Sequence, residues 1–309
     1  MKEELKIHPR DNVAVCLKAQ GEIPAGHKMA LCDIPEGGEV IKYGCRIGLA
    51  RCNIHKGEWV HTRNLRSALR VHEEYVYHPA ECALPGRAPR TFRGFVRAGG
   101  RVGIRNEIWI LPTVGCVGKA AQSLARQTRE YLHGSVTDVL AFEHPYGCSQ
   151  LGDDQENTRQ ALAALACHPN AGGVLVLGLG CENSGVEEIR KRMENCDPQR
   201  VKFLVCQDAD DEMAEGLALL HELIDRAAKD VRQEVGEDKL VLGLKCGGSD
   251  GFSGLTANPV IGVLSDRIVA CGGASLLTEV PEMFGAEQQL MDRCENETVF
   301  RDTVRLIQS

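Results

Sequence analysis

A long apolar run is absent from this 309-residue sequence, and no stretch approaches the roughly 20 apolar residues that a membrane-spanning helix needs. The first six residues, Met-Lys-Glu-Glu-Leu-Lys, also lack the apolar core of a signal peptide. Neither membrane insertion nor secretion is therefore expected. We expect a cytoplasmic protein.

Cationic residues are outnumbered by acidic residues. The sequence has 36 lysines and arginines and 43 aspartates and glutamates, and its formal net charge is -7. Nucleic acids and anionic membranes bind clustered positive charge, so neither is expected as the main partner. An anionic small molecule is compatible with this balance if a few local cations overcome the background.

Cysteine pairs of the CxxC type are missing, although the sequence contains fourteen cysteines. Structural zinc sites commonly use such pairs, so a structural zinc site is not expected. Disulfides are rare in the cytoplasm, and the thiols are therefore expected to be core groups, metal ligands or catalytic groups.

The length allows two domains, and the N-terminal part has the pattern of an all-β module. Apolar runs at 13–17, 29–32, 40–43 and 59–62 are typical of short strands. Three similar strings with glycine, which tolerates the backbone of tight turns, separate them: Ile23-Pro24-Ala25-Gly26, Ile34-Pro35-Glu36-Gly37 and Ile54-His55-Lys56-Gly57. We predict a β module over residues 1–72.

Residues 73–100 are rich in proline and arginine and are predicted to form a linker. From residue 101 to 309, apolar runs alternate with amphipathic segments, and the expected strands lie at 107–114, 136–142, 173–179, 201–206, 240–244 and 274–278. Strands that alternate with helices form a parallel sheet covered on both faces. This predicts a doubly wound, Rossmann-like α/β domain, although the glycine fingerprint of dinucleotide-binding folds is missing.

Four of the expected strands run into a turn that contains glycine and cysteine. These turns carry Cys116, Cys148, Cys181 and Cys246. Ligands of open parallel sheets bind at the carboxyl ends of the strands, so the four thiols are predicted to lie on one rim. The alternative is that tight strand-to-helix turns simply require small residues there.

Polar residues that a core would not tolerate surround these thiols. Carboxylate, imidazole and thiolate groups from separate strand ends are typical ligands of a divalent ion such as Fe2+ or Mn2+. The candidate metal ligands are Cys148, Cys181, Cys246, His144 and Glu182, and the candidate substrate-binding groups beside them are Gln150, Asn183, Ser249 and Asp250. For Asp153 and Asp154 the alternative is a solvated helix start.

An iron–sulfur cluster is a second interpretation of the rim cysteines. A mononuclear ion is favoured over it, because the cysteines come from separate strands without the close spacing of cluster ligands.

Further candidates combine cations and imidazoles. Arg105 and Asn106 enter the first strand of the α/β domain, and a guanidinium group can grip a carboxylate with two parallel hydrogen bonds. His27 and Lys28 stand at a turn of the β module, where they could transfer protons, and His61 is a third candidate. For each of these residues, the alternative is an ordinary exposed side chain without a catalytic or binding function.

A family resemblance emerges when these strings are read together. Gly26-His27-Lys28, Ile41-Lys42-Tyr43-Gly44 and Ile47-Gly48 resemble the SAF-type (β-clip-like) module that opens altronate and galactarate dehydratases. The strings at 102–107, 111–116, 146–154, 178–183, 244–251 and 278–287 resemble the central region of the same family. The matches run in order over nearly the whole sequence.

Two departures from the family pattern stand out. Members usually present two histidines in the part of the module where this sequence reads His61-Thr62-Arg63-Asn64. Members also continue for a further large C-terminal segment. Either these residues are part of a longer chain, or another polypeptide supplies that segment.

The resemblance implies a hydro-lyase that converts D-altronate to 2-keto-3-deoxy-D-gluconate with a divalent ion. It implies His27 and Lys28 as the proton-transfer pair and Arg105 as the clamp on the substrate carboxylate. Galactarate or a related sugar acid is the alternative substrate, and a non-catalytic sugar-acid-binding or assembly fragment is the alternative to an enzyme. A homo-oligomer is expected as the common default.

Overall fold

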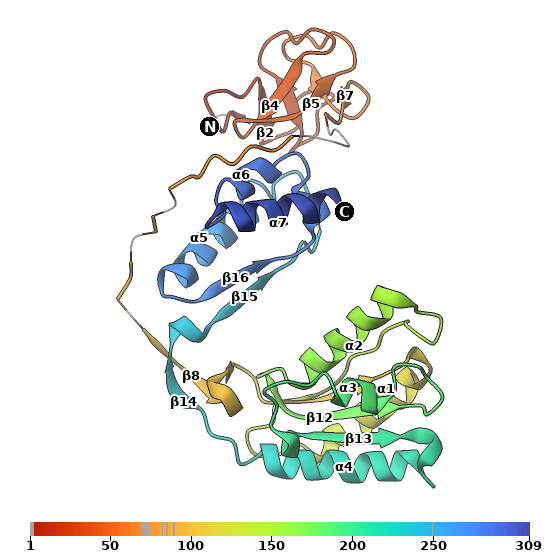
Figure 1. Cartoon of the computed structure of the whole chain (residues 1–309). Helices are drawn as coiled ribbons and strands as arrows, with labels where there is room; N and C mark the ends of the chain where they lie inside the picture. Colours follow the sequence, from red (N-terminus) through yellow and green to blue (C-terminus); the bar gives the residue numbers. More distant parts are fainter. Residues whose placement is uncertain (1–2, 69–73, 82, 85, 89, 249) are drawn as a thin grey trace. The chain divides into compact units, whose positions relative to one another are not determined.

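The chain divides into two compact units, each described by itself. A computed structural model describes residues 3–68, 74–81, 83–84, 86–88, 90–248 and 250–309. The outer unit combines Met1–Ala88 with Val241–Ser309, and the central unit is Pro89–Leu240 (Figure 1). This division differs from the single α/β domain expected over 101–309. The last two expected strands, at 240–244 and 274–278, belong to the same unit as the N-terminal β module.

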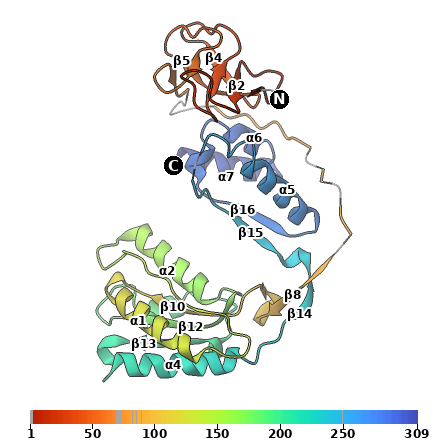
Figure 2. The same ribbon diagram turned by 180° about the vertical axis from the view of Figure 1, so that it is seen from behind.

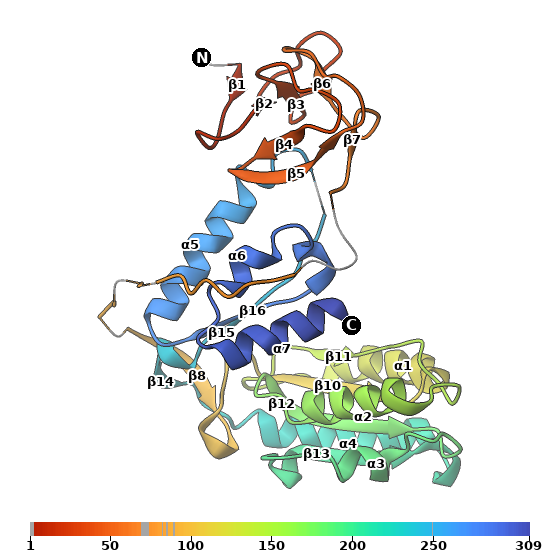
Figure 3. The same cartoon turned by 45° about the horizontal axis from the view of Figure 1, so that its top comes forward.

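The N-terminal part of the outer unit is the expected β module, drawn at the top of Figure 3. One antiparallel sheet has the order β1-β2-β3-β6 and comprises β1 (Glu4–Leu5), β2 (Val13–Cys16), β3 (Lys28–Ala30) and β6 (Trp59–Val60). The second has the order β4-β5-β7 and comprises β4 (Glu39–Lys42), β5 (Cys45–Ala50) and β7 (Leu65–Arg66).

The three repeated strings of the module form turns. Ile34 and Ile54 are buried in its core and pair with each other through an antiparallel bridge. Gly26, Gly37 and Gly57 close the strings with φ angles of 82°, 76° and 83°, a backbone region that favours glycine. The repeated isoleucine and glycine therefore supply a core anchor and a turn each time.

The central unit contains a four-stranded parallel sheet in the order β11-β10-β12-β13 (Figure 2). Its strands are β10 (Glu107–Pro112), β11 (Val139–Ala141), β12 (Ala171–Gly178) and β13 (Val201–Val205), and the helices between them are α1 (Gly118–Thr128), α2 (Gly152–Ala166), α3 (Val186–Arg190) and α4 (Glu212–Ala227). Each strand begins within three residues of its expected position. The strand and helix alternation of the sequence is therefore confirmed here.

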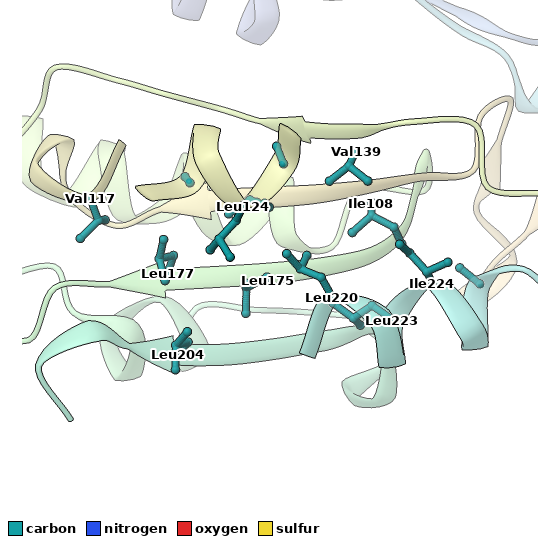
Figure 4. Packing of buried hydrophobic residues seen from close by; sticks show 14 of the residues in the cluster. Ile108, Val117, Leu124, Val139, Leu175, Leu177, Leu204, Leu220, Leu223 and Ile224 are labelled. Atoms are coloured by element: carbon teal, nitrogen blue, oxygen red, sulfur yellow. The ribbon is translucent and has the colours of Figure 1, made fainter. Parts of the chain in front are cut away.

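Helices cover both faces of this sheet because its central strands are apolar throughout. Leu124 of α1 and Leu220 of α4 pack with Ile108 and Leu175 on one face (Figure 4). On the other face, Trp109 of β10 packs with helices α2 and α3. Each fully buried large aliphatic side chain contributes roughly 1.5–3 kcal/mol, so these two clusters hold the sheet rigid.

A smaller antiparallel sheet belongs to the same unit. It has the order β14-β8-β9 and comprises β8 (Thr91–Val96), β9 (Val102–Gly103) and β14 (Gln233–Gly236). Strand β8 lies in the predicted linker, which is therefore wrong at its C-terminal end. Its partner β14 is about 140 residues further along the chain, and short-range sequence patterns carry no signal for such a pairing.

The C-terminal lobe of the outer unit has its own sheet, in which β15 (Val241–Leu244) and β16 (Ala274–Leu277) pair in parallel. Its helices are α5 (Ala257–Ala270), α6 (Glu287–Met291) and α7 (Glu297–Gln308), shown in Figure 3. Short 3-10 turns complete the chain: η1 (Ala98–Gly100), η2 (Gly115–Val117), η3 (Arg129–Tyr131), η4 (Pro198–Arg200), η5 (Cys206–Asp208), η6 (Glu237–Lys239) and η7 (Val280–Met283).

Part of the predicted linker is docked on this lobe. The Tyr75 hydroxyl donates to Glu287 Oε1 at 2.7 Å, and the Tyr77 hydroxyl donates to the Cys294 carbonyl at 2.6 Å. The Tyr77 ring also packs against Phe300 with centroids 5.1 Å apart. Among the described residues, no helix is both long and apolar enough to cross a membrane.

Candidate functional site

Three of the four cysteine turns meet at one edge of the central sheet, where β10, β11 and β12 end. The Gly115 amide donates to the Tyr146 carbonyl at 2.8 Å, which joins the turns of Cys116 and Cys148. The Asn183 side-chain amide donates to the Cys148 carbonyl at 3.5 Å, which joins the turn of Cys181. The central edge, as we call these three turns, carries exposed Cys116, Cys148 and Cys181.

Glu182 organises the turn that carries Cys181. Its carboxylate accepts hydrogen bonds from the Thr113 hydroxyl at 2.5 Å and from the backbone amides of Leu179 and Gly180 at 3.1 and 2.7 Å. Burial raises the pKa of Glu182, but these hydrogen bonds outweigh burial and lower it below its usual value. Glu182 is therefore an anion that is already bound to its own loop.

His144 offers one nitrogen that fits a metal ligand. Its Nε2 lies 2.8 Å from the Pro112 carbonyl, which can only accept, so Nε2 carries the proton and Nδ1 the lone pair. Nδ1 is buried and has no hydrogen-bond partner among the described residues. A carbonyl that orients the ring in this way is the usual outer partner of a metal-binding histidine.

The predicted ligand set is divided between the two units. His144, Cys148, Cys181 and Glu182 belong to the central edge, whereas Cys246 follows β15 in the outer unit. Within the described parts of the chain, no three His, Cys, Asp or Glu side chains form a group that could hold a metal ion. The fit to a divalent ion therefore rests on His144 Nδ1 alone among the described residues.

A hollow of about 600 Å³ lies beside His144, between the turn after β11 and helix α2. Gln150 lines it, and its side-chain amide donates to the Thr158 hydroxyl at 2.9 Å. Asp154 lines it too and belongs, with Asp153, to the first turn of α2, where carboxylates stabilise the helix dipole. Both aspartates therefore stand at the helix start, although the N-cap residue is Leu151 and no side chain caps the helix.

Arg105 and Asn106 lie at the wrong end of the sheet for the role that we expected. Both precede β10, whereas the central edge follows it, and a six-residue strand spans about 20 Å. Asn106 is completely buried, where it accepts from Arg97 at 2.8 Å and donates to the Ser135 hydroxyl and the Ala227 carbonyl. Arg105 is exposed and pairs with Glu107 at 3.4 Å. The two residues do enter the first strand of the sheet as predicted, but at this end they are not next to the central edge.

The outer unit brings two of the three predicted proton-transfer residues, His27 and His61, together in the β module. Their rings and the indole of Trp59 form one cluster, with centroids 5.3 and 4.8 Å from the indole and 6.3 Å from each other. Lys28 begins β3 and pairs with Val60 of β6. The module therefore presents two imidazoles together, although one of the histidines typical of the family pattern is missing.

The turn that precedes His27 contacts the loop that follows β15. A Cβ on Gly26 would lie 3.0 Å from Gly251 Cα, and one on Gly251 would lie 2.7 Å from the Gly26 carbonyl oxygen. Only glycine at both positions allows this approach, which places His27 next to the loop of Cys246 and Asp250. The carboxyl ends of β15 and β16, where ligands of parallel sheets bind, are thus covered by the module.

The loop itself is held by hydrogen bonds to carboxylates. Asp250 Oδ1 accepts from the amides of Phe252 and Ser253 at 2.6 and 3.0 Å, and Ser249 lies outside the described residues. Glu279, with a left-handed φ of 62°, accepts from the Cys246 amide at 2.9 Å and pairs with Lys245 at 3.3 Å. The amide of Cys246 first, and then Lys245, lower the pKa of Glu279.

Sequence reasoning missed two residues of this region, Glu279 and Lys42. Both belong to strings that carry the family resemblance, and that was one available signal. Glu279 directly follows the expected strand at 274–278, and this position at a strand end was a second signal that was not used.

Comparison with known families accounts for three successive parts of the chain. The model described as altronate/galactarate dehydratase SAF domain matches residues 17–68. The second domain of D-galactarate dehydratase/altronate hydrolase matches residues 94–228, and the C-terminal model of D-galactarate/altronate dehydratase matches residues 237–309. The chain belongs to the altronate/galactarate dehydratase family. The interval from 228 to 237 between two family models lies close to the observed unit boundary at Leu240.

Curated members of the altronate/galactarate dehydratase family resemble the chain along almost its whole length. Altronate dehydratase of Escherichia coli (strain K12) is 48% identical over 98% of this chain, and altronate dehydratase of Bacillus subtilis (strain 168) is 47% identical over 99%. Galactarate dehydratase (L-threo-forming) of E. coli is 31% identical over 96%. The chain spans 65%, 66% and 62% of the lengths of these relatives.

Proposed function

We propose that this chain serves the dehydration of a sugar acid, with D-altronate as substrate and 2-keto-3-deoxy-D-gluconate as product. The observation that carries the proposal is the contact of Gly26, the residue before His27, with Gly251 of the loop after β15, in a chain 48% identical to an altronate dehydratase. The reaction class is that of a hydro-lyase.

The chemistry requires a base and an acid close to the same two carbons. The base removes the proton on C2, next to the carboxylate, and the acid protonates the hydroxyl that leaves C3 as water. The resulting enol then tautomerises to the 2-keto acid. His27 and Lys28 are the groups that we assign to these transfers, with His61 stacked beside them.

Lys28 has the electrostatics of such a group. Burial, and then the charge of Lys42, lower the pKa of Lys28. A lysine with a lowered pKa releases and accepts a proton closer to neutral pH, which suits proton transfer.

A divalent ion, Fe2+ or Mn2+, remains part of the proposal. His144 Nδ1 and the thiolates of Cys148 and Cys181 are the groups of the central edge that would hold it. When bound, such an ion supplies Lewis-acid stabilisation of the charge that develops on the substrate oxygens. A Rossmann-like arrangement of the central unit is part of the proposal, and the four-stranded parallel sheet with turns at the carboxyl ends of its strands supports it.

The first test replaces His27 by alanine. We expect turnover of D-altronate to fall about 100-fold or more, because the variant lacks a positioned proton-transfer group. Formation of 2-keto-3-deoxy acid is measured anaerobically with added ferrous or manganous ion. His55→Ala is the matched control, since His55 is an exposed histidine of the same module.

Two results would contradict the proposal. Undiminished turnover in His27→Ala would remove His27 from the mechanism. Turnover of galactarate but not altronate by the unmodified chain would transfer the substrate assignment to the alternative, and binding without any product would favour a sugar-acid-binding or assembly role.

A further inference from the structure

A second hollow, of about 430 Å³, lies within the outer unit between the β module and the C-terminal lobe. The module lines it with Lys42, Tyr43, Cys45 and Arg46, and the lobe lines it with the segment that follows β16, including Phe284. Its size falls in the range of roughly 300–1,000 Å³ that is usual for small-molecule sites. Among the described residues that line it, Lys42 and Arg46 are cations and none is a carboxylate, and Arg46 pairs with Glu39 outside the lining at 3.4 Å.

The hairpin that carries these cations is held in place. Tyr43 and Gly44 form its turn with φ angles of 59° and 73°, and Asp11 accepts from the Gly44 amide at 2.7 Å. The Tyr43 ring packs so closely over Gly254 that a side chain on Gly254 would overlap it. Lys42 and Arg46 are therefore presented by a fixed turn that is tied to the lobe.

The two lysines of this region lack counter-charges. Neither Lys28 nor Lys42 forms an ion pair with any residue that the structure describes, although both are half-buried. Burial lowers the pKa of Lys42, and the carboxylate of Asp11 opposes this only in part. Asp11 is itself engaged by the amides of His8 and Gly44. A bound anion would offset the cost of placing two cations together.

We propose that this hollow binds the carboxylate of the sugar acid, with Lys42 as its ionic anchor and Arg46 as a second cation at the hollow. The inference rests on the proposed function and deepens it, since it replaces Arg105, which lies in the other unit. The hollow and the predicted proton-transfer residues belong to the same unit, and the hairpin of Lys42 is tied through Tyr43 and Gly254 to the loop that Gly26 contacts. Lys42 is thus a substrate-binding residue and Lys28 a proton-transfer residue.

The experiment compares Lys42→Met, Lys42→Arg and the control Lys56→Met in the full chain. Lys56 is an exposed lysine in a turn of the same module, outside the hollow. Calorimetry measures the binding of D-altronate, of the neutral polyol altritol and of inorganic phosphate. We expect Lys42→Met to weaken altronate binding roughly 10- to 100-fold, since a charge-assisted hydrogen bond is lost. Lys42→Arg should retain affinity within a few-fold, and Lys56→Met should match the unmodified chain.

Each other outcome overturns the inference. Altronate affinity that is unchanged in Lys42→Met, or equal affinity for altritol and altronate, would show that no carboxylate is anchored there. Phosphate that binds more tightly than altronate and depends on Lys42 would make the hollow a phosphate site instead. Absence of altronate binding by the unmodified chain would equally refute it.

A product assay separates this inference from the proposed function. Lys42-dependent altronate binding without 2-keto-3-deoxy product would uphold the carboxylate site and refute the dehydratase assignment. Product formation with an unaltered KM in Lys42→Met would uphold the dehydratase assignment and refute the carboxylate site.

Discussion

Asn106 shows how a residue can look functional in a sequence and serve stability in the fold. Its neighbour Arg105 suggested a pair of donors for a substrate carboxylate. In the structure, the Asn106 side-chain oxygen instead accepts a hydrogen bond from Arg97, a cation whose side chain is only 6% exposed. The sequence alone does not tell whether a polar residue at the start of a strand binds a ligand or stabilises the core.

Asn106→Ala should therefore destabilise the central unit without acting on a ligand. We expect a loss of roughly 2–4 kcal/mol in the free energy of unfolding, because groups around a buried cation are left without a partner. Urea unfolding followed by fluorescence measures this loss. Asn258→Ala, at an exposed asparagine of α5, is the control and should change little. Equal stability of the two variants would contradict the structural role of Asn106.

At the scale of elements, the contact between two loops decides where the imidazoles lie. Gly26 and Gly251 touch through their backbones, so neither loop can carry a side chain at this point. The strands and turns on either side were predictable from periodicity. Their contact was not, because it joins segments 225 residues apart.

Gly251→Ala tests this contact. The added Cβ would lie 2.7 Å from the Gly26 carbonyl and must displace the turn before His27, so we expect altronate turnover to fall at least 10-fold. Gly262→Ala in α5 is the matched control, since nothing lies within 4 Å of its added Cβ. That control should be stabilised by roughly 1 kcal/mol, because alanine favours the helix. Undisturbed turnover in Gly251→Ala would show that the contact does not position the site.

At the scale of the whole molecule, ionic networks set the response to pH. Asp230 of the central unit pairs with Arg97 at 2.6 Å and with Arg200 at 2.8 Å. Burial raises the pKa of Asp230, but the two guanidinium groups outweigh burial and lower it below its usual value of 3.8. The native state thus binds this proton less readily than the unfolded chain.

The sign of the pH effect follows from this difference. The contribution of Asp230 to stability is fully present above pH 3.8 and is lost as the pH falls through its lowered value in the folded state. In Asp230→Asn, we expect a lower thermal midpoint at pH 7 and a smaller further decrease between pH 5 and 3. Asp208→Asn, at an exposed site, should follow the unmodified chain. Parallel pH profiles for Asp230→Asn and the unmodified chain would contradict the assignment.

Much of the architecture was accessible from the sequence. Periodicity located the strands of the central sheet, and the repeated isoleucine–glycine strings located the turns of the module. The candidate site was only partly accessible. His27 and His61 do lie together, and three of the four cysteine turns share one edge of the central sheet, but Cys246 belongs to the other unit and Arg105 and Asn106 stand at the opposite end of the sheet.

The sequence by itself determined the local structure, because side-chain alternation and turn residues act over a few neighbours, and it determined the family through its ordered strings. Only the tertiary structure decided that β15 pairs with β16, that Asn106 is a core group and that Lys42 lines a hollow together with Arg46. These facts depend on contacts between distant segments, where burial and charge depend on the packed fold and not on the local sequence.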